Sequence, residues 1–264
     1  MCVKFFSRKS FLIKGEFMFM DLRSAKKILK KVEKDYNIIA KEWSLTRSRP
    51  RAYQIAMTKR IKKGDKVLDL GCGNAVLYEI LAGKSIDYVG LDVSSKLLNL
   101  AKKNISSVKK NGERARLIKG DIVDLPFSKN QFDWVLSLAV LHHIPSRELQ
   151  KKSAEEIYKI LKPGGRIVIS VWNLHTVYAR EKFKLNDFNL LRPRGWEKND
   201  FLTPWKATLK KIIQRYIYRF NKKELYDLFA KAGFKKIKVG YGDKNGEWTK
   251  SLNKSYNIIL EAEK

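Results

Sequence analysis

The residues from 67 to 92 combine side-chain types and spacing that suit ligand binding. They read VLDLGCGNAVLYEILAGKSIDYVGLD, a pattern that predicts a strand, a tight turn, a helix and a second strand ending at Asp92. Gly71 and Gly73 directly follow the first strand, and a glycine turn lets the backbone approach a ligand where a Cβ atom would intrude. The sequence therefore predicts a binding site at this turn.

Two kinds of ligand suit a glycine turn that is followed by an acidic residue about 20 positions later. The dinucleotide fingerprint has a third glycine, where this chain has Val76. Asp69, just ahead of the glycines, would repel a pyrophosphate and attract a cation. S-adenosylmethionine carries an ammonium, a sulfonium and a ribose diol but no phosphate. We therefore favour it over a dinucleotide, and over a third interpretation in which the turn is purely structural.

Acidic side chains end the first three predicted strands, at a sheet edge where ligands of doubly wound folds bind. Asp92 can accept hydrogen bonds from both ribose hydroxyls, because a carboxylate has two oxygens. Asp121 can accept from the adenine amine, with the backbone amide of Ile122 as the complement. The residues expected to contact the cofactor are Asp69, Gly71, Cys72, Gly73, Asp92, Val93, Asp121, Ile122 and Ala139.

His142 and His143 are predicted to end the fourth strand, near the transferred methyl group. We expect no metal, because the chain has only one other histidine, His175, and Cys72 is poorly placed to complete a ligand set. One histidine should face the acceptor and the other should pack locally; the sequence does not tell which. An ionised carboxylate acceptor needs positioning but no general base. Arg47 is the candidate for holding it.

Alternating strands and helices must position these residues. They predict an α/β fold with a doubly wound, Rossmann-like sheet of seven mostly parallel strands and an antiparallel C-terminal edge hairpin. After a flexible basic and aromatic leader at 1–20, residues 21–264 are expected to form one domain. Its parts are an N-terminal helical lid at 21–63, a cofactor-binding core at 64–172, an insertion after the fifth strand at 173–221, and a C-terminal helix and hairpin at 222–264.

The formal net charge of +29, from 56 Lys and Arg against 27 Asp and Glu, would attract a polyanion such as nucleic acid. A lysine-rich genome would give the same total, so the local arrangement matters more. Residues 206–220 predict a helix with one apolar and one basic arc. Basic side chains among aromatic ones can bind phosphates and stack on bases. The expected RNA-binding residues are Arg49, Lys206, Lys210, Lys211, Arg215 and Arg219.

The cysteines and the N-terminal segment indicate the compartment. Cys2 and Cys72 do not suggest a disulfide framework, so a reducing cytoplasm is expected. Charged residues interrupt the apolar residues of the first 20 positions before a signal sequence or membrane span could form. We expect no membrane association.

Successive motifs across about residues 66–172 resemble those of class I adenosylmethionine-dependent methyltransferases: GDKVLDLGCGN, GLDVS, GDIVDLPF, FDWVLSLAVLHHI and LKPGGRIVISVW. The flanking YNIIAKEWSLTRSRP, FLTPW, RYIYRF and GYGDKNGEW are similar to segments of the tRNA methyltransferases that esterify carboxymethyluridine at the wobble position. This resemblance implies direct methyl transfer from S-adenosylmethionine to a carboxylate on tRNA. It also implies that Arg47 and one of His142 and His143 line the acceptor pocket, and that a small activator subunit is a possible partner.

Two departures from that family bear on the prediction. Pro50-Arg51-Ala52 stands where the family usually has Pro-Trp-Pro, which affects the acceptor pocket, and Ala75 replaces a further glycine, which affects only the loop. Two alternatives remain open. The acceptor is a small molecule such as a quinone precursor or a lipid acid, or the chain is a non-catalytic RNA-binding protein with the same fold.

Overall fold

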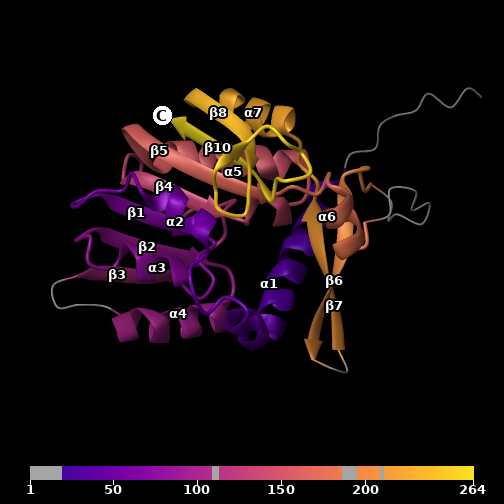
Figure 1. Ribbon diagram of the computed structural model, residues 1–264, viewed down its shortest axis with the longest axis horizontal. Coiled ribbons are helices and arrows are strands. Elements are labelled where there is room, and N and C mark those ends of the chain that lie inside the picture. Colours follow the sequence, from indigo (N-terminus) through magenta and orange to yellow (C-terminus); the bar gives the residue numbers. More distant parts are fainter. Residues whose placement is uncertain (1–19, 109–112, 186–194, 209–210) are drawn as a thin grey trace, which may run out of the picture.

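The computed structural model describes residues 20–108, 113–185, 195–208 and 211–264, so the predicted leader lies outside it except for Met20. The central sheet has the order β3-β2-β1-β4-β5-β10-β8-β9 (Figure 1). Its parallel strands are β1 (Lys66–Leu70), β2 (Asp87–Asp92), β3 (Arg114–Lys119), β4 (Phe132–Leu138) and β5 (Leu161–Trp172). The antiparallel edge consists of β8 (Lys235–Gly242), β9 (Trp248–Thr249) and β10 (Asn257–Glu263).

This arrangement confirms the predicted doubly wound α/β fold, with one difference in strand number. The described sheet has eight strands rather than seven, because the two-residue strand β9 adds to the outer edge. The C-terminal strands do not extend the sheet in chain order either. Strand β10 inserts between β5 and β8, so the last segment of the chain is clamped between two neighbours.

Helices cover both faces of the sheet, and each face has its own apolar core. Buried residues of α2 (Ala52–Thr58), α3 (Val76–Leu81) and α4 (Ser95–Val108) form one cluster with side chains of the strands. Buried residues of α5 (Arg147–Ile160) and α7 (Lys222–Lys231) form the other. The alternation of side chains along each strand supplies both clusters, so the carboxyl ends of the parallel strands are held rigidly.

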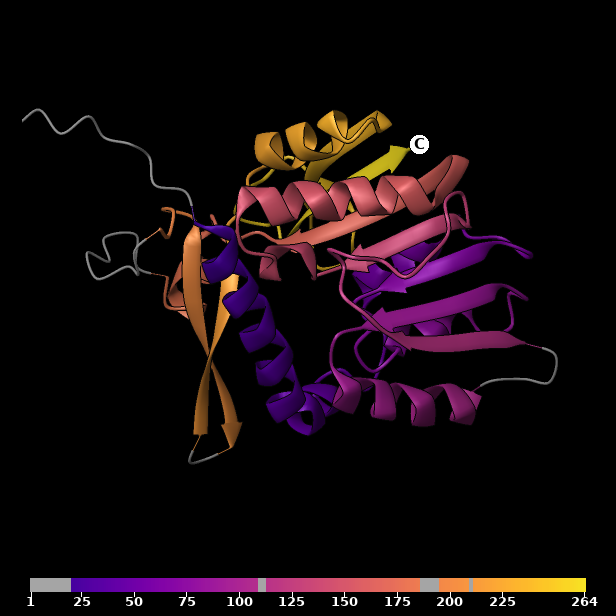
Figure 2. The ribbon, with the colours of Figure 1, turned by 180° about the vertical axis from the view of Figure 1, so that it is seen from behind.

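Helix α1 (Leu22–Leu45) is one continuous helix within the segment 21–63, which was predicted to be helical. The Asp21 side chain begins it by accepting a hydrogen bond from the Ser24 amide at 2.9 Å. Figures 1 and 2 show α1 between the sheet and the hairpin of the insertion. It is tied to α4 by the Asn37 side chain, which accepts from the Lys96 amide at 3.1 Å.

The predicted helix at 206–220 is wrong: this segment belongs to an antiparallel hairpin of β6 (Asp200–Thr208) and β7 (Lys211–Tyr218), which follows the short helix α6 (Val177–Lys182). Apolar residues at 212, 213, 216 and 217 match the repeat of a helix. They also match the pattern of a strand with apolar residues on both faces. Strand propensity decides between them, because KIIQRYIY is rich in β-branched and aromatic residues. Ile213 and Arg215 of the hairpin face α1, whereas Ile217 packs with Leu174, Ala179 and Phe201.

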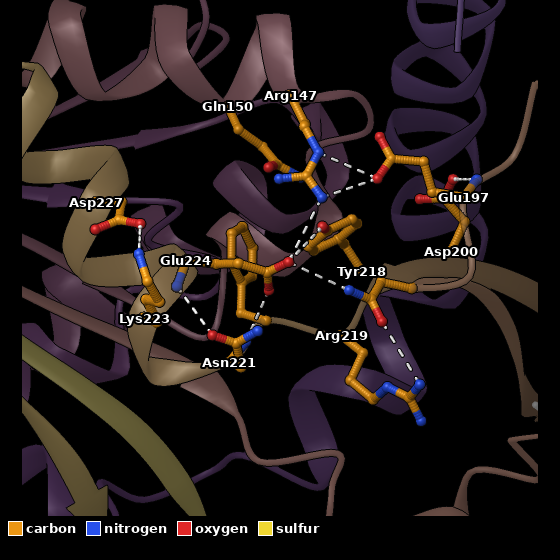
Figure 3. A network of polar contacts seen from close by, with 12 residues as sticks. Arg147, Gln150, Glu197, Asp200, Tyr218, Arg219, Asn221, Lys223, Glu224 and Asp227 are labelled. Carbon is orange, nitrogen blue, oxygen red and sulfur yellow. Dashed lines mark hydrogen bonds and ion pairs between the residues drawn. The ribbon is translucent and has the colours of Figure 1, made fainter. Parts of the chain in front are cut away.

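Polar contacts join the base of this hairpin to the helices behind it (Figure 3). The Arg147 guanidinium, at the start of α5, donates to Glu197 at 3.0 and 3.1 Å and lies 3.5 Å from Glu224 of α7. Glu224 also accepts from the Asn221 amide at 3.0 Å. The insertion is therefore fixed to the sheet domain near the point where it rejoins that domain, at the start of α7.

Candidate functional site

A cavity lies at the carboxyl ends of the parallel strands, where β1 has β2 on one side and β4 on the other. This reversal of strand order is where doubly wound folds bind ligands. All nine residues predicted to bind the cofactor line it, together with Arg47, Arg49 and His143: Asp69, Gly71, Cys72, Gly73, Asp92, Val93, Asp121, Ile122 and Ala139. His142, Arg215 and Arg219 are not among the lining residues.

Two buried aspartates stand at the centre of the cavity. Asp69 is 3% exposed and accepts a hydrogen bond from the Tyr88 hydroxyl at 2.8 Å. Asp92 accepts from the Gly73 amide at 2.9 Å and from the Ser94 amide at 2.8 Å. Burial raises the pKa of Asp69 to about 7 and that of Asp92 to about 6. A cation bound beside them would favour their ionised forms.

Asp121 is the third acidic residue of the cavity, and it follows β3. Its carboxylate accepts a hydrogen bond from the Val123 amide at 3.2 Å, and burial raises its pKa. Within the described residues, none of these three aspartates forms an ion pair with a lysine or arginine. Uncompensated carboxylates at this edge suit a positively charged ligand, which is the property expected of S-adenosylmethionine.

The two glycines of the turn are required by the protein's own packing. Gly71 and Gly73 have φ angles of 77° and 57°. A Cβ atom on Gly71 would lie 2.3 Å from Val140, and one on Gly73 would lie 2.7 Å from Trp43 of α1. Ala75 has a φ of 56°, which explains why a glycine would suit this position. The turn thus brings α1 and the loop after β4 close around the cavity.

Arg47 also lines the cavity, and its charge is opposite to that of the three aspartates. Its guanidinium lies 4.3 Å from the ring centre of Trp43 and 5.4 Å from that of Trp205. Burial lowers its pKa to about 10, so the side chain remains charged at neutral pH. The exposed Arg49 and Arg51 line the same cavity, and Arg51 donates to the Tyr256 hydroxyl at 3.2 Å. This end is basic and aromatic, as an anionic acceptor would require.

The two histidines have different surroundings, and neither ends β4 as predicted. Strand β4 ends at Leu138, Ala139 takes a φ of 62°, and both histidines lie in the short 3-10 helix η1 (Leu141–His143). His143 lines the cavity. His142 packs behind it, with its ring centre 4.5 Å from that of Trp172. Burial lowers the pKa of both imidazoles, that of His143 to about 3.

The hydrogen bonds of His143 fix its tautomer. Its Nδ1 atom lies 2.8 Å from the Tyr216 carbonyl oxygen, which can only accept, so Nδ1 carries the proton. Its Nε2 atom therefore accepts from the Tyr36 hydroxyl at 2.8 Å. With both nitrogens engaged, His143 holds Tyr36 in place rather than serving as a free base.

The predicted RNA-binding residues of the insertion do not share one exposed face. Arg215 is 2% exposed, so the expectation of a solvated charge is wrong there. The cause is the strand, which turns residue 215 toward α1 instead of outward. Arg219 is half-buried and lies 4.9 Å from the ring centre of Phe201. Lys210 and the side chains of Lys206 and Lys211 lie outside what the structure describes.

Several aromatic residues of the cavity were missed at the sequence level. Tyr36 and Trp43 are seven positions apart on α1, and Trp172 ends β5. The spacing places the first two on one helix face, and a strand's carboxyl end is a ligand-binding position. Both signals were present in the sequence, but both also describe ordinary core residues.

The described residues hold no group of three or more His, Cys, Asp or Glu that could bind a metal ion. Over the same residues, no helix has a run of apolar residues long enough to cross a membrane.

Comparison with known proteins identifies the family. Residues 61–233 match the family model described as "Methyltransferase domain". A protein of Encephalitozoon cuniculi that is named as a methyltransferase is 30% identical over 79% of this chain and 89% of its own length. The tRNA (carboxymethyluridine(34)-5-O)-methyltransferase of Schizosaccharomyces pombe is 26% identical over 82% of this chain and 93% of its own length. The chain spans only 41% of the Arabidopsis thaliana relative of that name.

A relative with a different acceptor is equally similar. The demethylmenaquinone methyltransferase of Staphylococcus carnosus is 29% identical, over 70% of this chain and 74% of its own length. The relatives therefore agree on methyl transfer and differ in the molecule that receives the methyl group.

Solved structures agree on the fold. A S-adenosylmethionine-dependent methyltransferase of Methanosarcina mazei has a TM-score of 0.62 at 23% identity, covering 79% of this chain and 96% of that one. A Burkholderia thailandensis N-methyltransferase crystallised with S-adenosylhomocysteine has a TM-score of 0.62 at 17% identity, covering 92% of each chain. A Haloferax volcanii methyltransferase bound to the Trm112 activator has a TM-score of 0.59 at 18% identity, covering 88% of this chain and 96% of that one. The chain belongs to the methyltransferase domain family and is an S-adenosylmethionine-dependent methyltransferase.

Proposed function

We propose that this enzyme methylates the carboxylate of a carboxymethyl group on the wobble uridine of tRNA. The observation that carries the proposal is the division of one cavity into two ends of opposite charge. Asp69, Asp92 and Asp121 line the end built from the strands, and Arg47 stands at the end built from the segment after α1. A cationic donor and an anionic acceptor would be held at complementary ends.

The residues of the acidic end would hold the cofactor. Asp69 suits the cationic methionine part, Asp92 the ribose hydroxyls, and Asp121 with Ile122 the adenine. When bound, S-adenosylmethionine supplies an electrophilic methyl carbon, to which a carboxylate oxygen bonds as the carbon–sulfur bond breaks, giving a methyl ester and S-adenosylhomocysteine. Opposite charges disappear together in this step and no proton moves, so this chain needs no general base. The low pKa of His143, which makes it a weak base, is compatible with such a reaction.

Arg47 would position the acceptor. A guanidinium binds a carboxylate through two parallel hydrogen bonds, and the Trp43 and Trp205 rings beside it offer apolar surface to a uracil base. The exposed Arg49 and Arg51 at the cavity would contact neighbouring phosphates. Exposed lysines of α1, such as Lys26, Lys27 and Lys30, extend the basic surface. A tRNA substrate implies activity in the cytoplasm.

A neutral quinone precursor fits this cavity less well. Arg47 forms no ion pair with a carboxylate of the described chain; its polar contact there is the Thr46 hydroxyl at 2.7 Å. Closing the cavity over a neutral acceptor would leave a half-buried charge without a counter-charge, which costs free energy. The similarity to a quinone methyltransferase therefore supports the fold and the cofactor more than the acceptor.

The test is methyl transfer to tRNA whose wobble uridine carries a free carboxymethyl group. The purified enzyme, alone and with a Trm112-type activator, would be incubated with labelled S-adenosylmethionine. Mass spectrometry of the nucleosides should show a methyl ester that mild alkali removes. A matched tRNA with unmodified uridine at that position is the control. Equal labelling of the two tRNAs, or labelling of a demethylated quinone alone, would refute the proposal.

A further inference from the structure

Arg215 is a buried cation that no carboxylate of the described chain neutralises. It is 2% exposed, and its Nε atom has no hydrogen-bond partner. Its polar contact is a hydrogen bond of 3.3 Å from Nη1 to the Tyr36 hydroxyl oxygen. Burying a charge without a counter-charge costs free energy of folding. Packing alone does not explain why an arginine occupies this position.

The surroundings of Arg215 join it to the wall of the cavity. Its guanidinium lies 4.7 Å from the ring centre of Trp205 and 5.5 Å from that of Trp172. Trp172 and Tyr36 line the cavity, whereas Arg215 does not. Arg215 therefore stands one layer behind the acceptor end, with a tyrosine hydroxyl and an indole ring between it and the ligand space.

A second arginine lies close to this layer. The guanidiniums of Arg47 and Arg215 both lie within 5.4 Å of the Trp205 ring centre. The two positive charges repel each other, and together with burial the charge of Arg215 contributes to the lowered pKa of Arg47. The polar and titratable side chains around them are those of Tyr36, Thr46, Arg51, Tyr53, His142 and His143. None of these is a carboxylate, and His143 is neutral at physiological pH. An anion in the cavity is the missing counter-charge.

Resting on the function proposed above, we propose that Arg215 is a specificity-determining positioning residue that makes the acceptor site select a carboxylate over a neutral group. It acts through Tyr36, whose hydroxyl it contacts, and through its charge behind the Trp172 and Trp205 rings. Arg47 grips the acceptor, and Arg215 raises the positive potential of the whole pocket. Arg215 acts on the acceptor without touching it, because the low dielectric of the interior lengthens the reach of a charge. The preference for a carboxylate over a neutral group therefore depends on both arginines.

The experiment compares two nucleosides of nearly equal shape. Dissociation constants of 5-carboxymethyluridine and of its neutral amide, 5-carbamoylmethyluridine, would be measured by calorimetry in the presence of S-adenosylhomocysteine. The wild type should prefer the carboxylate. Arg215→Gln should reduce that preference about tenfold or more, and Arg215→Lys should retain part of it because the charge remains.

Two controls separate specificity from folding and from net charge. Arg114→Gln removes the same charge from an exposed position at the start of β3, and it should leave the preference unchanged. Affinity for S-adenosylmethionine should be unchanged in Arg215→Gln, which shows that the variant folds. If Arg215→Gln does not fold, Tyr36→Phe decides, since it keeps the ring and removes the hydroxyl that links Arg215 to the cavity; it should lower the preference.

The outcomes distinguish this inference from the proposed function. A folded Arg215→Gln with the wild-type preference, or a Tyr36→Phe with the wild-type preference where the first variant is unfolded, overturns the inference while tRNA methylation stands. If the wild type fails to methylate tRNA and binds neither nucleoside, the proposed function falls. Tryptophan fluorescence with acetate and acetamide then tests the inference separately. Acetate binding that depends on Arg215 supports it, and its absence overturns it.

Discussion

The side-chain amide of Asn74, in the turn after β1, donates a hydrogen bond of 3.0 Å to the backbone carbonyl of Arg47. The same amide donates to the Ser44 hydroxyl at 2.9 Å, and Asn74 is 1% exposed. The backbone carbonyl of Asn74 accepts in turn from the Asn104 side chain of α4 at 2.9 Å. One buried side chain therefore fixes the distance between the glycine turn and Arg47, the residues proposed to bind the donor and the acceptor.

Asn74→Ala should uncouple the two ends. Loss of two buried hydrogen bonds should lower the free energy of unfolding by about 1–3 kcal/mol. The turnover number should fall about tenfold through misplacement of Arg47, while the affinity for S-adenosylmethionine changes less. Calorimetry and single-turnover methyl transfer measure the two effects. Asn104→Ala, which removes the bond on the other side of Asn74, is the matched control and should spare turnover. Equal turnover losses in both variants would contradict the coupling.

Cofactor affinity should rise with pH. The pKa of Asp69 is raised to about 7 by burial, so this carboxyl is protonated in the free enzyme below neutral pH and must lose its proton to bind a cation. Affinity for S-adenosylmethionine should therefore be on the order of tenfold weaker at about pH 5.5 than at about pH 8. Asp69→Asn should bind weakly at both and show a flatter profile. An unchanged slope in this variant would assign the pH dependence to another group.

The same pKa shift gives a signed prediction for stability without cofactor. When the pKa of a carboxyl is higher in the folded than in the unfolded state, the folded protein binds more protons at pH values between the two pKa values. The free energy of unfolding therefore falls as pH rises through this range. The difference in unfolding free energy between Asp69→Asn and the wild type should therefore increase between about pH 4 and pH 7. Urea unfolding of both proteins across this range measures it. A decreasing difference would show that the pKa of Asp69 is not raised.

Asp92→Ala should weaken cofactor binding by about 1–3 kcal/mol, roughly ten- to a hundredfold. Part of this loss is direct. The rest follows because the Gly73 and Ser94 amides lose their common acceptor, so the turn loosens. Asp124→Ala, at an exposed position of the loop after β3, should bind like the wild type. Retained affinity in Asp92→Ala would remove Asp92 from the binding site.

Arg47→Ala should lower turnover with carboxylate-bearing tRNA about tenfold or more while sparing affinity for S-adenosylmethionine. Arg47→Lys should restore part of the rate, since it keeps the charge but loses the paired hydrogen bonds. Steady-state kinetics with separate variation of tRNA and cofactor distinguishes the two affinities. A parallel loss of cofactor affinity would mean that Arg47 supports the cavity as a whole.

His143→Gln tests whether this histidine is a base. A base would make the rate fall as pH drops through its pKa, but the pKa of His143 is about 3 and both its nitrogens are hydrogen-bonded. The variant should keep the shape of the wild-type pH–rate profile and lose rate moderately, through displacement of Tyr36. A change in the shape of the profile between about pH 6 and pH 8 would show that His143 transfers a proton.

The convergence of the predicted glycine turn and aspartates at one cavity could be predicted from the sequence because the signals are local. Asp69, Gly71 and Gly73 lie within one five-residue segment, Asp92 ends β2, and Asp121 follows β3, and the apolar patterns of these strands are clear. Their convergence follows from the rule that parallel strands end at one edge. The tight contact of Trp43 with Gly73 was not predictable, because nothing local indicates where a preceding helix will lie.

The acceptor end was harder to predict because it depends on distant segments and on one ambiguous one. Residues 212–217 fit a helical and a strand repeat equally well, and the choice decides where Arg215 points. As a helix residue it would be solvated; as a strand residue it is buried against Tyr36. One misjudged element thus moved a charge from the surface to the interior and hid its connection with the cavity.

The glycine turn of the cavity follows a strand of the sheet, whereas Tyr36, Trp43 and Arg47 come from α1 and the segment after it, with Trp205 of the inserted hairpin beside Arg47. With the acceptor bound there, as proposed, a change of the methylated molecule would need changes only outside the sheet. Two relatives that are each 29% identical agree with this, since one is named as a tRNA methyltransferase and the other as a demethylmenaquinone methyltransferase.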